Sequence, residues 1–156
     1  MATPEESRLV GDFGEYALAY FLTKKGIHVM RADTVFFDII VKDPKGIIFK
    51  KNKITGISVK IRDRTQSTST CTIPHTDFTR IKEYGKKWNI EPWMCHMIVF
   101  TDKEKKRILE GFLFSYKDAE KFFAQGKRKY AISFSLLRKE IGKKFVRDKN
   151  YFKWFL

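Results

Sequence analysis

Two apolar runs, FFDIIVK at residues 36–42 and ITGISVKIR at residues 54–62, decide the fold that the sequence predicts. Both are rich in β-branched residues, and the second alternates apolar with polar positions, as expected for a strand in a sheet. Turn-forming residues, among them Pro44 and Gly46, separate the two runs. The pattern therefore predicts neighbouring strands of an antiparallel meander. Further strands are expected at 27–32 and 47–50.

Helical patterns surround these strands. Residues 4–25 follow an N-capping Thr3, carry a proline in the first turn and apolar residues at helical spacing, and end at Gly26. A second amphipathic helix is predicted over residues 75–88. The remaining expected elements are strands at 93–101, 108–115 and 130–134, helices at 115–125 and 136–141, and a loop at 64–72.

Together these elements predict one domain of the α/β class, in the form of an α+β sandwich. A central mixed sheet contains the antiparallel meander, and the N-terminal helix and the second helix pack on it. The chain has 156 residues and shows neither an internal repeat nor a linker. We therefore expect a single domain, 1–156, with a basic and aromatic C-terminal extension at about 143–156.

The chain is strongly basic, and the excess charge is unevenly placed. Its formal net charge is +14, because 32 Lys and Arg oppose 18 Asp and Glu. Residues 42–64 carry 8 basic and 2 acidic side chains, and residues 127–156 carry 10 and 2. Two concentrated blocks fit a binding surface for a polyanion better than an evenly solvated shell. Nucleic acid is the expected partner, and a generally lysine-rich proteome is the alternative explanation.

The two fold-deciding runs also contain candidate chemical groups. In the second run Ser58, Lys60 and Arg62 share one face of the strand, opposite the apolar residues. In the first run Asp38 lies between apolar residues, so that its carboxylate requires a lysine, a metal ion or both as a partner. An ordinary cross-strand ion pair between Asp38 and Lys60 is the structural alternative.

At these positions the sequence resembles the PD-(D/E)xK nuclease superfamily, which has a restriction-endonuclease-like fold. The nearest subgroup in appearance comprises archaeal-type Holliday junction resolvases and related small endonucleases. The resemblance rests on GDFGE at 11–15, FDII at 37–40 and ISVK at 57–60, and it covers about a third of the chain. It implies an endonuclease that acts on DNA, with branched DNA as a candidate substrate.

The resemblance also implies roles for individual residues. Asp38 and Glu15 would hold Mg²⁺ or Mn²⁺, and Lys60 would polarise the attacking water or the scissile phosphate. The family has Asp or Glu where this chain has Ser58, which supplies no negative charge. Asp33 is the nearest candidate to replace that acid, because Asp63 lies on the strand face opposite Lys60.

Two further segments are candidates for contact with nucleic acid. The polar run after residue 62 would contact phosphates, or would form a flexible polar loop. The C-terminal segment would bind nucleic acid through its cations, while most of its aromatic rings pack on the core or on a second subunit. The residues proposed for contact are Arg62, Arg64, Gln66, Ser67, Lys143, Lys144 and Arg147.

Other classes of function lack support in the sequence. No phosphate-binding glycine loop, Ser/His/Asp arrangement or helical pair of histidines occurs, which disfavours nucleotide hydrolases, triad hydrolases and zinc proteases. Cys71, His75, Cys95 and His96 could in principle ligate zinc, but Cys95 and His96 are adjacent in a strand and face opposite ways. We therefore expect no zinc, but buried cysteines and a surface or capping histidine.

Location and partners complete the expectations. Two unpaired cysteines, no basic-then-apolar leader and no apolar stretch of ~20 residues predict an intracellular, cytoplasmic protein without a membrane partner. A homodimer is a candidate assembly. Three functions remain open: a Mg²⁺- or Mn²⁺-dependent endodeoxyribonuclease, a catalytically degenerate nucleic-acid-binding module on the same fold, and an oligomeric interaction protein with a basic surface.

Overall fold

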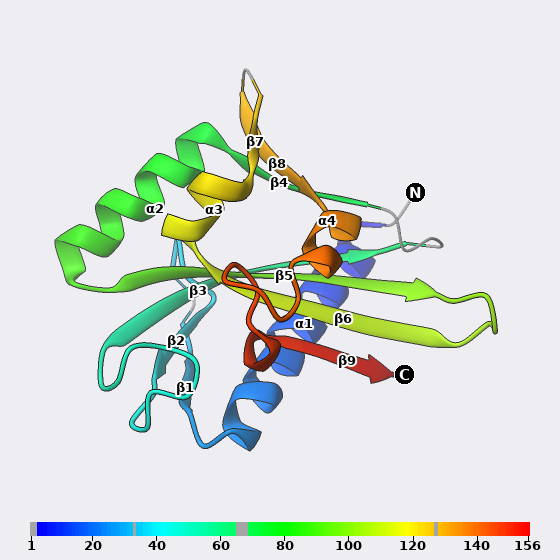
Figure 1. Ribbon diagram of the computed structural model, residues 1–156, viewed down its shortest axis with the longest axis horizontal. Helices are drawn as coiled ribbons and strands as arrows, with labels where there is room; N and C mark the ends of the chain where they lie inside the picture. Colours follow the sequence, from blue (N-terminus) through cyan, green and yellow to red (C-terminus); the bar gives the residue numbers. More distant parts are fainter. Residues whose placement is uncertain (1–2, 33, 65–68, 127) are drawn as a thin grey trace.

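A six-stranded mixed sheet forms the centre of the computed structural model, which describes residues 3–32, 34–64, 69–126 and 128–156 (Figure 1). Strand order is β1-β2-β3-β5-β6-β9. Only β3 and β5 pair in parallel, whereas the other neighbouring pairs are antiparallel. The expected mixed sheet with an antiparallel meander is confirmed. Its strands are β1 (His28–Arg31), β2 (Ile39–Lys42), β3 (Ile54–Asp63), β5 (Glu91–Thr101), β6 (Arg107–Ser115) and β9 (Tyr151–Phe155).

Helices cover both faces of this sheet. Helix α1 (Pro4–Lys24) contributes to one core, and α2 (His75–Trp88) and α3 (Tyr116–Phe122) contribute to the other (Figure 1). No helix within the described residues is long and apolar enough to cross a membrane. A smaller sheet, of order β4-β8-β7, extends the second core. The remaining elements are β4 (Thr70–Pro74), β7 (Ala124–Gln125), β8 (Lys129–Ser133), α4 (Phe134–Lys139) and the 3-10 turn η1 (Asp148–Asn150).

Helix α1 lies close to β3 because of its sequence. Thr3 and Glu6 form a capping box that satisfies backbone N–H groups at the first turn. One turn before the most buried residues, Gly14 allows the helix to approach Ile61, whose side chain would lie 3.1 Å from a Cβ at position 14. This close approach brings Glu15, the next residue, toward the sheet.

The segment 47–50 is not a strand, which corrects the sequence-based expectation. The reason is the carboxylate of Asp43, which is fully buried at the end of β2 and accepts backbone N–H groups at 2.8–3.2 Å. Those groups are therefore engaged in a compact loop and are unavailable for a β-ladder. The donors are Lys45, Gly46, Ile48 and Phe49.

Three strands occur where the sequence predicted other structure, and the first of these corrections is β7, which occupies the last residues of the expected helix 115–125. β4 occupies part of the expected loop 64–72, since Cys71 and Ile73 alternate inward and pair with β8. β9 lies within the expected extension 143–156 and forms the edge of the main sheet beside β6. Gly111 makes this pairing possible, because a Cβ there would lie 2.1 Å from the ring of Phe152. The C-terminal aromatic residues thus belong partly to the core.

The loop held by Asp43 yields a prediction about stability. Burial alone would raise the pKa of Asp43, but the backbone N–H donors outweigh burial and lower it. Asp43→Asn should therefore reduce the free energy of unfolding by about 2 kcal/mol at pH 7. Since the carboxylate stabilises the fold only while it is ionised, the difference from wild type should shrink as the pH falls below about 4.

Urea unfolding at pH 7 and pH 3 would measure this difference. Asp102→Asn is the matched control, because Asp102 accepts N–H groups from Glu104 and Lys106 in an exposed turn. We expect a smaller loss for the control. Equal losses for the two variants at pH 7 would show that burial of the Asp43 carboxylate adds nothing.

Candidate functional site

Asp38 is anchored to β3 by backbone hydrogen bonds. Its N–H donates to the carbonyl of Ile57 at 3.0 Å, and its Oδ2 accepts the N–H of Val59 at 2.6 Å. The pairing of Ile39 with Ile57 places Asp38 level with Ser58 on the neighbouring strand. The acid and the serine of the two predicted motifs therefore lie side by side.

Glu15 meets Asp38 in a pocket of about 340 Å³ between α1 and the start of the meander. This acidic pocket is lined by Asp12, Glu15, Arg31, Ala32 and Asp38. Arg31 Nη2 lies 2.7 Å from Glu15 Oε2 and 3.6 Å from a carboxylate oxygen of Asp12. The hydrogen bond to Glu15 raises the pKa of Arg31, which stays charged. The arginine thus neutralises part of the acidic pocket.

Lys60 lies outside the acidic pocket. Together with Ser58 it lines a second, smaller pocket of about 160 Å³ toward α2 and β4, with Arg80 and Asp77 at its rim. No carboxylate of the described residues forms an ion pair with Lys60, so the alternative pairing with Asp38 is not present. The structure brings Glu15 to Asp38 in one pocket and groups Ser58 with Lys60 in the other.

Tyr116 occupies the surroundings of Ser58 and was not found from the sequence. Both residues are buried, with exposed fractions of 1% for Tyr116 and 4% for Ser58. Burial raises the pKa of Tyr116, and the nearby Ser58 side chain counteracts this in part without completing a hydrogen bond. A neutral phenol therefore faces the position at which the resembled family has an acid. The only signal in the sequence was its place after Ser115, which caps α3.

The buried histidine beside Lys60 has a structural role. His96 pairs with Lys60 across β3 and β5 and stacks on the ring of Phe114. Burial, followed by the charges of Lys60 and Arg62, lowers the pKa of His96 to about 3. The imidazole is thus neutral at physiological pH and adds no charge behind Lys60.

The donor set of the acidic pocket suits a hard divalent cation. Mg²⁺ and Mn²⁺ prefer carboxylate oxygens, which Asp12, Glu15 and Asp38 supply. In the described part of the chain, however, no group of three or more His, Cys, Asp or Glu side chains is close enough to hold a metal. Because Arg31 holds Glu15, binding a cation there requires Glu15 to exchange its partner. Asp33 lies outside the described residues.

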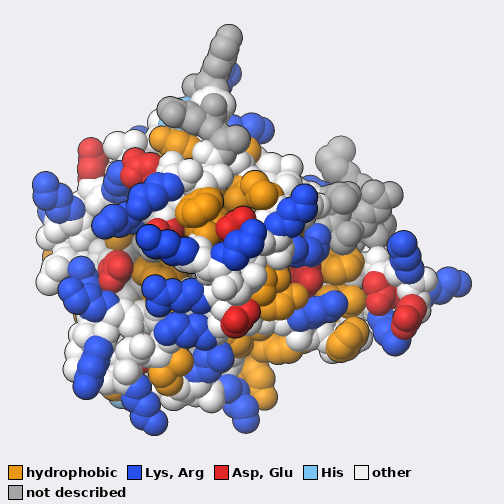
Figure 2. All heavy atoms as spheres, viewed as in Figure 1, with side chains coloured by type: hydrophobic (Ala, Val, Ile, Leu, Met, Phe, Trp, Pro, Cys, Tyr) orange, Lys and Arg blue, Asp and Glu red, His pale blue; other side chains and the backbone are white. Residues whose placement is uncertain are grey.

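The residues predicted to contact nucleic acid fall into separate regions. Arg62 and Arg64 are exposed near the end of β3, whereas Gln66 and Ser67 lie outside the described residues. Lys144 and Arg147 line a cleft at the opposite end of the sheet, beside the loop at 43–53. Lys143 instead pairs with Glu140 at 3.4 Å. Figure 2 shows Lys and Arg gathered over the part of this face where α2, α3 and the loop lie.

The remaining soft metal ligands do not assemble. Cys71 and Cys95 are free and buried, and they belong to different cores on opposite sides of the sheet. Burial raises the pKa of both thiols, which keeps them protonated. Neither cysteine therefore has the electropositive, exposed surroundings of a reactive thiol.

Comparison with known proteins gives a result for the fold alone. No protein-family model and no curated protein matches the sequence. Among solved structures, a Holliday junction resolvase from the archaeal hyperthermophile Archaeoglobus fulgidus matches with a TM-score of 0.54 and 12% identity, over 83% of this chain and 88% of that one. A nuclease from a fusselovirus matches with a TM-score of 0.39 and 15% identity, over 86% of each chain. The chain therefore has the fold of the archaeal resolvase, as its motifs predicted.

Proposed function

We propose that the protein is a divalent-metal-dependent endonuclease that acts on DNA. The observation that carries this proposal is the position of Asp38, which is hydrogen-bonded to β3 beside Ser58 and shares a pocket with Glu15. The likeness of the fold to that of the resolvase supports the proposal. The net charge of +14 supports a nucleic acid as substrate, and the likeness to a resolvase favours DNA, including branched DNA.

Each residue of the site would have a distinct task. Asp38 and Glu15 would hold Mg²⁺ or Mn²⁺, which when bound would act as a Lewis acid on the phosphodiester. Val59 N–H fixes Oδ2 of Asp38, so the carboxylate is already oriented. Lys60, which no acid neutralises in the described residues, would stabilise the negative charge that develops on the phosphate. Ser58 would orient a water molecule next to Asp38.

A DNA-binding module without catalysis is the second candidate function. Two observations favour it: Ser58 replaces an acid, and Arg31 already neutralises Glu15. Both reduce the negative charge available for a cation. This candidate predicts DNA binding that needs no metal and does not depend on Asp38.

Removing the charge of Asp38 tests the first candidate. Asp38→Asn keeps an oxygen for the Val59 N–H but lowers the negative charge of the acidic pocket. We expect nicking of DNA in Mg²⁺ or Mn²⁺ to fall by about 10²–10³-fold, the usual effect of removing one electrostatic group from such a site. Lys60→Gln should reduce nicking to a similar extent. Gel assays on linear, single-stranded and branched DNA would measure the rates.

Glu83→Gln is the matched control, because Glu83 is exposed on α2 and forms no ion pair with the residues that the structure describes. It should nick DNA at the wild-type rate. If wild type binds all three DNA forms but cleaves none of them in either metal, the enzymatic proposal is wrong and the binding module is correct.

Restoring the missing acid provides a second prediction. Ser58→Asp restores a carboxylate at the position where the resembled family has an acid, so it should strengthen binding of Mn²⁺ and increase nicking. Since position 58 is buried, the variant should be less stable than wild type without metal, and Mn²⁺ should raise its Tm more than that of wild type. Differential scanning calorimetry with and without Mn²⁺ would measure this.

Ser58→Asn, which has a similar size but no charge, is the control for Ser58→Asp. It should lose stability without gaining a response to Mn²⁺. If Mn²⁺ raises the Tm of wild type, Ser58→Asp and Ser58→Asn by the same amount, the cation binds elsewhere. The proposed metal site at Asp38 and Glu15 is then wrong.

A further inference from the structure

A basic cleft of about 480 Å³ lies at the end of the sheet where β5 begins and β6 ends. Its walls come from the loop at 43–53, the first residues of α3 and the segment 144–150, which are distant in the sequence (Figure 1). Six cations line it: Lys50, Lys117, Lys121, Lys144, Arg147 and Lys149. The two basic blocks of the sequence thus meet at one place.

The six cations of the basic cleft are not neutralised by the protein. Within the described residues none of them forms an ion pair. The cleft also contains the acids Glu91 and Asp118, but Asp118 is bonded to Ser115, whose Oγ lies 2.9 Å from its Oδ2. Six cations against two acids leave an excess of positive charge that repels itself, and a bound polyanion would offset this repulsion.

The floor of the basic cleft carries polar groups without partners. Asn150 is 3% exposed, and its Oδ1 has no hydrogen-bond partner among the described residues. The indole Nε1 of Trp93 is also buried without a partner, while its ring packs edge-on against Phe49. Buried polar atoms in native proteins are normally satisfied, so Asn150 Oδ1 points to a water molecule, whereas the Trp93 N–H can donate to water or to an anion.

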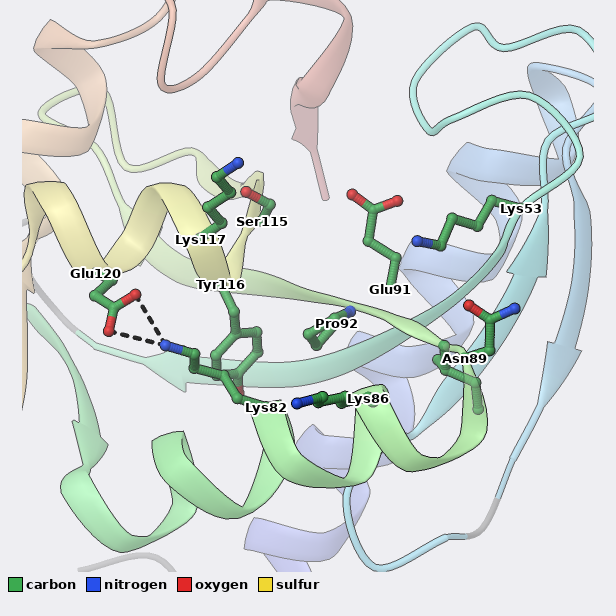
Figure 3. A pocket seen from close by; sticks show the side chains of 12 residues that line it. Lys53, Lys82, Lys86, Asn89, Glu91, Pro92, Ser115, Tyr116, Lys117 and Glu120 are labelled. Atoms are coloured by element: carbon green, nitrogen blue, oxygen red, sulfur yellow. Dashed lines mark hydrogen bonds and ion pairs between the residues drawn. The ribbon is translucent and has the colours of Figure 1, made fainter.

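A neighbouring pocket extends the positive surface. It has a volume of about 460 Å³ and shares Glu91, Ser115 and Lys117 with the basic cleft. Figure 3 shows Lys53 and Lys86 at its edge, away from the only ion pair drawn there. That ion pair joins Lys82 to Glu120. The two hollows therefore form one basic band along α2, α3 and the loop at 43–53.

We propose that the basic cleft binds the phosphate backbone of a nucleic acid duplex, at a place separate from the acidic pocket. This inference deepens the proposed function and rests on it for the choice of DNA. A mononucleotide would leave most of the six cations without a partner, whereas a duplex backbone presents a series of phosphates. Trp93 lies in the cleft, and His96, which pairs with Lys60, lies three residues further along β5. Three residues of a strand span roughly 10 Å. One turn of duplex, about 34 Å, can span both positions.

Salt dependence of binding tests the proposal without relying on cleavage. The variant Lys144→Gln/Arg147→Gln removes two charges of the basic cleft, and Lys24→Gln/Lys103→Gln removes two exposed charges elsewhere as the matched control. Fluorescence anisotropy with duplex DNA in EDTA would give the affinity at several salt concentrations. We expect the cleft variant to bind more weakly and its slope of log K against log salt to fall by about 2.

A second pair of substitutions, Lys121→Gln/Lys149→Gln, should produce the same fall and guards against a folding defect in the first variant. The proposal is overturned if both cleft variants keep the wild-type slope, or if the control pair loses as much as they do. It is also overturned if inorganic triphosphate displaces the duplex from wild type at micromolar concentration, because the site would then be one for a small anion.

The same assay separates this proposal from the proposed enzymatic function. Asp38→Asn should bind duplex DNA in EDTA at least as tightly as wild type and with no fall in slope, because Asp38 lies in the acidic pocket and not in the basic cleft. A protein that never cleaves DNA but shows the expected fall in slope would refute the nuclease and support the cleft. Cleavage of DNA by wild type together with an unchanged slope in the cleft variants would support the nuclease and refute the proposal for the basic cleft.

Discussion

The parallel pairing of β3 with β5 is the constraint on which the rest of the structure depends. It joins the N-terminal meander to the β5–β6 hairpin through a register that runs from Thr55 opposite Glu91 to Asp63 opposite Val99. Parallel strands require a long crossover, and β4 and α2 supply it. Because helices cover both faces, residues 55–59 of β3 are buried in succession. A polar group at the centre of β3 is therefore buried, and it needs either a hydrogen-bond partner or a role in the chemistry of a site.

This constraint explains how the candidate site is arranged. Asp38 lies directly before the buried residues of β2. Its carboxylate accepts a hydrogen bond from the N–H of Val59. The side chain of Ser58, on the opposite face from Val59, packs toward Tyr116. Lys60 emerges where β3 becomes exposed again. The acids and the lysine therefore line two different pockets, one toward α1 and the other toward α2.

The sequence predicted the parts of the fold that follow from local patterns. The meander, α1, α2 and the β5–β6 hairpin follow from alternation, helical spacing and capping, and the motif residues Glu15 and Asp38 line one pocket. What it could not predict depends on partners distant in the chain. The loop after Asp43 forms because a buried carboxylate captures N–H groups, and β9 forms because Gly111 leaves room for Phe152. Arg31 and Tyr116 likewise belong to the candidate site through tertiary contacts, which no local sequence pattern indicates.

The distribution of charge connects the two functional regions. Acids are concentrated between α1 and the meander, where Arg31 pairs with Glu15, whereas the cations lining the cleft at the other end of the sheet form no ion pair with the described residues. A polyanion approaching this surface is attracted to the basic end and repelled from the acidic pocket unless a divalent cation is bound there. Metal binding and substrate placement would therefore be coupled. In the proposed enzyme the Arg31–Glu15 ion pair would compete with that cation, because the same carboxylate can bind either the arginine or the metal.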